Sequence, residues 1–153
     1  MLNNSAIVII EFMNERFNCR KSFTENFPIS ENSFFGKVVY CWTIESFIIE
    51  DLGTNRLLRV NKDDGLGVYV ELGEDSFLEN ESLEISNDGK YLFAFLENKK
   101  GFFKKEITEE NNGSFELKYF EFGDCEFSHF APLGTDVILF LEKSGYILVY
   151  SIS

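Results

Sequence analysis

A chain of 153 residues, of which 44% are hydrophobic and 18 are Phe, is long enough to bury a core, and this excludes disorder over most of its length. Its 26 acidic and 14 basic residues give a net charge of −12, which at long range repels phosphate backbones and anionic membranes and attracts basic surfaces. The same charge also suits a surface that merely keeps the protein soluble, so charge alone selects no partner.

Cysteine usage and the N-terminal residues bear on the cellular compartment. Cys19, Cys41 and Cys125 are odd in number and lack the short spacing of a metal site. The apolar core near the N-terminus covers only residues 6–10, with no basic residue before it, which is typical of neither a signal peptide nor a membrane span. We therefore expect a cytoplasmic protein with reduced thiols and no membrane contact.

The first predicted element is a strand over residues 6–12, AIVIIEF, which is rich in β-branched residues. Residues 14–33 are polar with interspersed aromatics, and we expect them to form a long loop or extended arm. We assign residues 1–27 to this strand and irregular arm, within a single domain over residues 1–153. The arm carries one of the few basic clusters, which comprises Arg16, Arg20 and Lys21.

From residue 37 the pattern is typical of strands. The runs KVVYCW, FIIEDL, RLLRV and VYVEL are separated by turn signals such as Asp63-Asp64-Gly65. Residues 113–122, GSFELKYFEF, alternate apolar and polar side chains, which favours a strand with one face in water. No stretch keeps an apolar stripe at helical spacing over three turns, so the fold is predicted to be nearly all β.

One strand–turn–strand unit recurs along the chain. NDGKYLFAFLENKKG matches PLGTDVILFLEKSG at an offset of 45 residues, which places Gly89 over Gly134. At an offset of 99 residues, GKVVYCWTIESFIIEDL also matches TDVILFLEKSGYILVYS, which places Val38 over Val137. We therefore predict about three repeats over residues 28–153.

Short strands that repeat at a period near 45 residues are typical of propeller blades, each of which is a four-stranded antiparallel sheet. The last copy, FSHFAPLGTDVILFLEKSGYILVYSIS, resembles the inner three strands of a WD-repeat blade, and SNDGKYL resembles the turn before the second strand of such a blade. The Gly-His pair of that family is absent, and Val149-Tyr150 and Glu50-Asp51 stand near the place of its Trp-Asp pair. The resemblance implies propeller-like antiparallel sheets in a looser relative of this family. A β-sandwich or a partly open barrel is the alternative.

Three blades would leave sheet edges uncovered, because closed propellers have four to eight blades. We expect residues Val38 to Trp42 and Tyr146 to Ile152 to be covered. Three alternatives would cover these segments. They are a second copy in a homodimer, a larger partner, and the N-terminal strand from Ala6 to Phe12 folding back.

Residues for catalysis or metal binding are scarce. His129 is the only histidine, and on an extended strand its side chain would lie about 13 Å from that of Cys125, too far to pair directly. Ser128 would point to the opposite face from its neighbour His129. No GxGxxG or GxxxxGK motif supports nucleotide binding, and Asp63-Asp64-Gly65 supplies too few ligands for a calcium loop. We predict no catalytic residue, no metal site and no cofactor.

One basic stretch stands out at a predicted hairpin tip, where lysines bracket Gly101-Phe102-Phe103. Basic residues interleaved with aromatics can hold phosphates and stack on bases, although lysines at a sheet edge also protect it against aggregation. The candidate partner-binding residues, for RNA or an acidic partner, are Arg16, Arg20, Lys21, Lys99, Lys100, Phe102, Phe103, Lys104 and Lys105.

These observations predict a protein that is not an enzyme, because the sequence shows no nucleophile–base, metal or phosphate-cradling constellation. The favoured function is a protein-interaction module or scaffold that docks in a larger assembly. The alternative is a small acidic inhibitor or silencing factor that occupies a basic functional site on a toxin, a nucleic-acid-binding enzyme or the ribosome.

Overall fold

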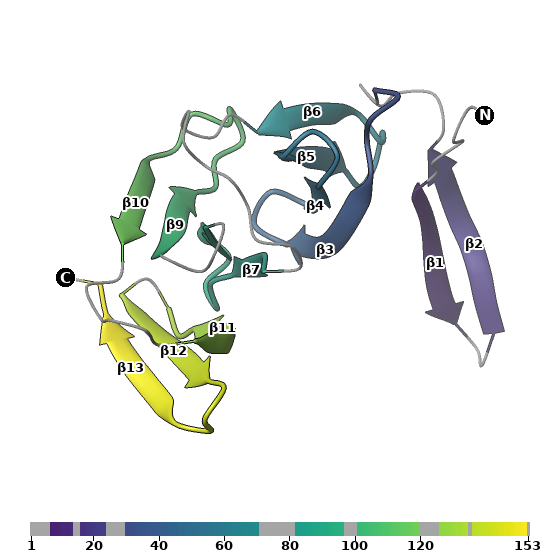
Figure 1. Cartoon of the computed structure of the whole chain (residues 1–153). Helices are drawn as coiled ribbons and strands as arrows, with labels where there is room; N and C mark the ends of the chain where they lie inside the picture. The colour runs from purple at the N-terminus through teal and green to yellow at the C-terminus, as the bar shows by residue number, and fades with distance from the viewer. Residues whose placement is uncertain are drawn as a thin grey trace.

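The regular structure of the described chain is all β, as the sequence predicted (Figure 1). The computed structural model describes residues 7–13, 16–23, 30–70, 82–96, 101–119, 126–134 and 136–152. Within these residues no helix is long and apolar enough to cross a membrane. The predicted cytoplasmic location stays a prediction.

The first sheet has four antiparallel strands in the order β3-β4-β5-β6. Tight turns join neighbouring strands, and two of these turns place a residue other than Gly in the left-handed region, Glu45 at φ 46° and Asn55 at φ 53°. The strands of this sheet are β3 (Phe35–Cys41), β4 (Ser46–Asp51), β5 (Arg56–Asn61) and β6 (Gly67–Val70).

The second sheet also has four strands, in the order β10-β9-β8-β7, and the terminal sheet has three, in the order β11-β12-β13. The strands of the second sheet are β7 (Glu84–Ile85), β8 (Tyr91–Phe95), β9 (Gly101–Glu106) and β10 (Phe115–Tyr119). Those of the terminal sheet are β11 (Phe127–Pro132), β12 (Val137–Glu142) and β13 (Ile147–Ser151).

A separate hairpin precedes these sheets. Strand β1 (Ile7–Met13) pairs with β2 (Arg16–Phe23), so residues 16–23 form a strand where the sequence predicted a loop or arm. The ladder of an antiparallel pair joins backbone groups, so a polar segment such as RFNCRKSF can take part in it without an apolar face.

The three sheets follow one another along an arc (Figure 1). Strand β7 lies beside both β3 and β11, so the first strands of the three sheets gather on one side of the array. The sheets pack through their faces, and the core therefore consists of separate layers between neighbouring sheets.

The layer between the first and second sheets is mainly aliphatic. It comprises Cys41, Ile48, Leu57, Val70, Leu83, Leu92, Ala94, Leu96 and Phe103. These side chains alternate along their strands with residues that point to the opposite face, as the period of two requires.

The layer between the second and terminal sheets is built mainly from phenylalanine. The ring of Phe140 lies 5.0 Å from that of Phe127 and 5.8 Å from that of Phe95, and Phe95 meets Phe130 edge to face at 4.6 Å. Such ring pairs contribute about 0.5–1.5 kcal/mol each beyond the burial of their area. This aromatic layer holds the terminal sheet on the array.

The observed strand order corrects the alignment of the first repeat. Val38 was aligned with Val137, but Val38 lies in the first strand of its sheet and Val137 in the second strand of the terminal sheet. This match is therefore wrong by one strand, whereas the offset of 45 residues correctly pairs β8 with β12. All half-buried strands share the same alternation, so the pattern does not identify a strand's place in its sheet.

Candidate functional site

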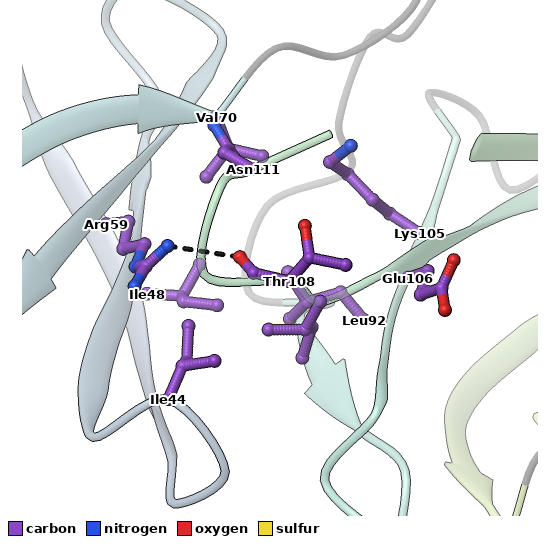
Figure 2. Close-up of a pocket in the computed structure, with 10 residues that line it drawn as sticks. Ile44, Ile48, Arg59, Val70, Leu92, Lys105, Glu106, Thr108 and Asn111 are labelled. Atoms are coloured by element: carbon purple, nitrogen blue, oxygen red, sulfur yellow. Dashed lines mark hydrogen bonds between the residues drawn. The ribbon is translucent and has the colours of Figure 1, made fainter. Parts of the chain in front are cut away.

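The junction between the first and second sheets is tied by Arg59 of β5. Its Nη1 donates a hydrogen bond to the backbone oxygen of Thr108 at 3.1 Å (Figure 2). It donates another to the backbone oxygen of Glu109 at 2.6 Å. Its Nε donates to the Oγ of Ser46 at 3.2 Å. The guanidinium group thus bridges two strands of the first sheet to the segment that follows β9.

A narrow pocket lies beside this arginine (Figure 2), with room for about one water molecule. Its polar lining groups already have partners within the chain: buried Lys105 donates to the backbone oxygen of Gly113 at 3.2 Å, and Asn111 donates to that of Tyr69 at 3.2 Å. The hydrogen bonds of these lining groups therefore stabilise the junction, and the pocket itself is too small for a substrate. It is lined by Ile44, Ile48, Arg59, Val70, Leu92, Lys105, Glu106, Ile107, Thr108 and Asn111.

Further polar contacts cross the same junction. The hydroxyl of Thr43 donates to the backbone oxygen of Gly89 at 2.7 Å, and Lys37 forms an ion pair with Glu84. The buried carboxylate of Glu50 accepts hydrogen bonds from the backbone N–H groups of Lys37 and Leu83, each at 3.0 Å. This carboxylate thus joins β3 to the segment just before β7.

A second buried carboxylate, Asp51, ties together both ends of the first sheet. It accepts hydrogen bonds from the hydroxyls of Ser33 at 2.8 Å and Tyr69 at 2.9 Å, and from the backbone N–H groups of Phe34 at 3.1 Å and Thr54 at 3.3 Å. Burial raises the pKa of Asp51, but these four hydrogen bonds outweigh it, so the pKa lies below its usual value. With every oxygen occupied by donors from its own sheet, Asp51 is a structural residue.

The structure places two of the residues that the sequence analysis considered for catalysis on β11. Ser128 lies at a β-bulge in β11 and its hydroxyl donates to the backbone oxygen of Leu141 at 3.2 Å, while His129 is exposed on the outer side of the sheet. Cys125 lies outside the described residues. Within the described part of the chain, no group of three or more potential metal ligands is present, and every buried side-chain nitrogen or oxygen has a hydrogen-bond partner.

The terminal sheet has an uncovered apolar face. Leu139 in the central strand lies opposite Ala131 and Val149, and Leu141 lies opposite Ile147, so these residues share one side of the sheet. The opposite side carries the Phe140 ring and faces the second sheet. We call the uncovered side the outer face of the terminal sheet. It comprises His129, Ala131, Val137, Leu139, Leu141, Ile147, Val149 and Ser151.

The exposure of this face is high for apolar residues. Ile147 is 66% exposed and Val149 is 70% exposed. The corresponding outward side of the first sheet differs, because Ile49, Leu58 and Val60 are at most 2% exposed there. The two ends of the array therefore differ in degree. The central strands of the first sheet are shielded there, while Val38 and Tyr40 of its edge strand β3 are 52% and 38% exposed on the same side.

The structure places the predicted partner-binding residues in several environments. Phe102 and Phe103 are fully buried in the core, so their rings are not available for stacking on a base. Lys104 lies over the ring of Tyr91, with its Nζ 4.3 Å from the centroid, and Lys105 lines the pocket beside Arg59. The side chains of Arg16, Arg20 and Lys21, like Lys99 and Lys100, lie outside what the structure describes. RNA contact through these basic residues stays a prediction.

The segments predicted to need cover are partly exposed. In the first segment Val38, Tyr40 and Trp42 are exposed, and in the second all residues from Tyr146 to Val149 are exposed. What covers them stays a prediction. Sequence reasoning singled out the strand β13 but missed Leu139 and Leu141 of β12, although their alternation with Ile138 and Phe140 contained the signal.

Comparison with known proteins bears on the fold. No protein-family model matches the chain, and no curated protein matches it. It resembles the crystal structure of a protein from Lactobacillus plantarum, with a TM-score of 0.50 and 14% identity over 95% of this chain and 50% of that one. A chain from Bacteroides uniformis, described as a putative 6-phosphogluconolactonase, matches with a TM-score of 0.49 and 13% identity over 97% of this chain and 52% of that one.

The chain thus spans about half the length of the solved chains that it matches. Both have propeller-like folds, and at this identity the likeness concerns the fold alone. The predicted propeller-like arrangement of antiparallel sheets is confirmed at this level.

The predicted function needs correction. We expected a scaffold or an acidic inhibitor and no enzyme, yet one of the two similar chains is described as an enzyme. That finding contradicts the expectation, which rested on the absence of short catalytic motifs. Propeller-like sheets bring together residues from separate strands, so a missing local motif does not exclude catalysis.

Proposed function

We propose that this chain works as one subunit of a larger propeller-like assembly, in which a partner sheet covers the outer face of the terminal sheet. The observation that carries this proposal is the exposure of Ile147 and Val149, at 66% and 70%, on a face that presents five aliphatic side chains besides Ala131, His129 and Ser151. Contiguous apolar faces of this kind mark sites of association, because leaving them in water is unfavourable.

The make-up of the sheets supports the proposal. Among the described strands, the first and second sheets have four each and the terminal sheet has three, with β13 at its edge. An edge strand of a sheet favours pairing with a further strand. The match to about half of a longer propeller-like chain is also expected for a part of a larger array.

The site at which the assembly binds or converts a ligand would then form only on completion. In support of this, the pocket beside Arg59 has room for about one water molecule and its polar groups are bonded within the chain. The proposal replaces the scaffold and inhibitor predictions, and it assigns the activity to the assembly and not to the isolated array.

We also infer that the three sheets are copies of one repeat that is related to WD-repeat blades. Gly89 and Gly134 have positive φ, at 72° and 86°, in the turns that precede the second strands of their sheets. Glu45 takes a left-handed conformation, with φ 46°, in the matching turn of the first sheet. A positive φ at the same place in three equivalent turns supports a common unit.

The assembly proposal is tested by combining light scattering with binding of a dye that fluoresces on apolar surfaces. The full-length chain should either be associated or, as a monomer, bind the dye; the variant Val149→Lys should reduce dye binding to the monomer because it places a charge on the face. A chain that stays monomeric at high concentration and binds no dye would refute the proposal, because the face would then be stable without cover.

A further inference from the structure

Resting on this proposed function, we infer that the partner is a second copy of this chain. The two copies meet through the outer faces of their terminal sheets, related by a two-fold axis. Both copies then use the same surface patch in the contact, as in other isologous dimers. The axis passes near Leu139, which lies at the centre of the face between Ala131 and Val149.

The shape of the face suits this contact. Its residues come from three adjacent antiparallel strands in register, so they form a continuous layer of side chains. Two such layers pack at a distance of about 10 Å between sheets, the spacing of sheets stacked face to face. The Phe140 layer on the other side of the same sheet shows that this sheet already packs in this way once.

The charge of the face also suits a second copy. Each copy carries a net charge of −12, so two copies repel each other unless they meet where acidic residues are absent. No Asp or Glu belongs to the outer face of the terminal sheet, although the chain contains 26. At physiological salt, charges further than about 8 Å away are largely screened, so apolar burial decides the outcome.

The other end of the array offers less apolar surface for association. Head-to-tail contact would require the terminal sheet to pack on the outward side of the first sheet, where Ile49, Leu58 and Val60 of the inner strands are already buried. On that side the edge strand β3 exposes Val38 and Tyr40. Because the inner strands at that end are shielded, the outer face of the terminal sheet is the favoured contact, and in a two-fold pair it is used up. The dimer is therefore a closed arrangement of two arrays and does not extend into a fibre.

The experiment is sedimentation of the full-length chain and of three lysine variants over a range of concentrations. The first is Val149→Lys on the outer face; the second is Val38→Lys in β3, which head-to-tail contact would bury. The third, Val68→Lys, is the matched control, since Val68 is an exposed valine in the edge strand β6 of the first sheet. Circular dichroism confirms that each variant keeps its strands.

We expect the wild type, Val38→Lys and Val68→Lys to be dimers. We expect Val149→Lys to dissociate, with a dissociation constant raised on the order of 100-fold, because the two-fold axis places the substitution in the interface twice. A dimer that both Val38→Lys and Val149→Lys disrupt would overturn pairing of the two outer faces in favour of head-to-tail closure, in which each terminal sheet packs on the first sheet of the other copy. If the wild type is a monomer that binds the apolar dye, the inference that the partner is a second copy is refuted, while the proposed function still stands.

Discussion

Removal of the Asp51 carboxylate should be among the most costly single changes in the first sheet. In Asp51→Ala, the hydroxyls of Ser33 and Tyr69 and the backbone N–H groups of Phe34 and Thr54 lose their acceptor. At about 1 kcal/mol for each lost hydrogen bond, the free energy of unfolding should fall by about 4 kcal/mol. With a urea dependence of about 2 kcal/mol per molar, the midpoint of unfolding should move by about 2 M.

The carboxylate also makes stability depend on pH. Because the pKa of Asp51 is lower in the folded chain than in the unfolded one, its contribution is present above the unfolded pKa of about 3.9 and is lost as the pH falls through the folded pKa. Asp51→Asn should therefore reduce stability at neutral pH and should weaken the loss of stability between roughly pH 5 and pH 3.

Urea unfolding at fixed protein concentration, followed at neutral and acid pH, measures both effects. The control is Asp136→Asn, which removes the same charge from an exposed position and should change the free energy of unfolding by less than about 0.5 kcal/mol. A loss below about 1 kcal/mol in Asp51→Ala would refute the reasoning. Equal acid sensitivity of Asp51→Asn and the wild type would refute the part that concerns pH.

Two further predictions concern packing. Phe140→Ala should lower the free energy of unfolding by about 3–5 kcal/mol in thermal or urea unfolding. The control Phe34→Ala, at a side chain that is 67% exposed, should be nearly neutral. Equal effects of the two substitutions would contradict the role of the aromatic layer. Gly53→Ala should cost about 2–3 kcal/mol or more in the same assay, because the added Cβ would lie 1.7 Å from the backbone oxygen of Asn32. Gly145→Ala meets no atom within 4 Å and should cost only the strain of its positive φ, about 1 kcal/mol, so a larger loss there than at Gly53 would argue against this contact.

The class of fold was predictable because it depends on local signals. Alternation in segments such as the one from Phe115 to Tyr119 and the turn glycines Gly89 and Gly134 needs only neighbouring residues to be read. The position of each strand within its sheet was harder to predict from the sequence. The turn between the first two strands of the first sheet has Glu45 in the left-handed position, so the glycine that marks the matching turns elsewhere is missing.

For the lysine-rich strand β9, the sequence did not show which side chains are exposed and which are buried. Phe102 and Phe103 are neighbours that point to opposite faces of β9, and both are buried because a sheet packs on each side. A hairpin tip would have left these rings in water, and the sequence alone did not show that the second sheet lies between two others. The ties made by Arg59 were also hidden, because they link backbone groups that are 49 and 50 residues away.

The two junctions of the array differ in a way that affects its curvature. Hydrogen bonds from Arg59, Thr43 and Asn111 have preferred directions and fix the angle between the first and second sheets. Contacts among rings such as Phe95 and Phe140 hold the terminal sheet mainly by apolar burial, and the arrangements that ring pairs prefer span a wider range of angles than a hydrogen bond allows. Among the contacts of the described residues, the first joint is therefore the more directed one, and the terminal sheet has more freedom to tilt toward whatever packs on it.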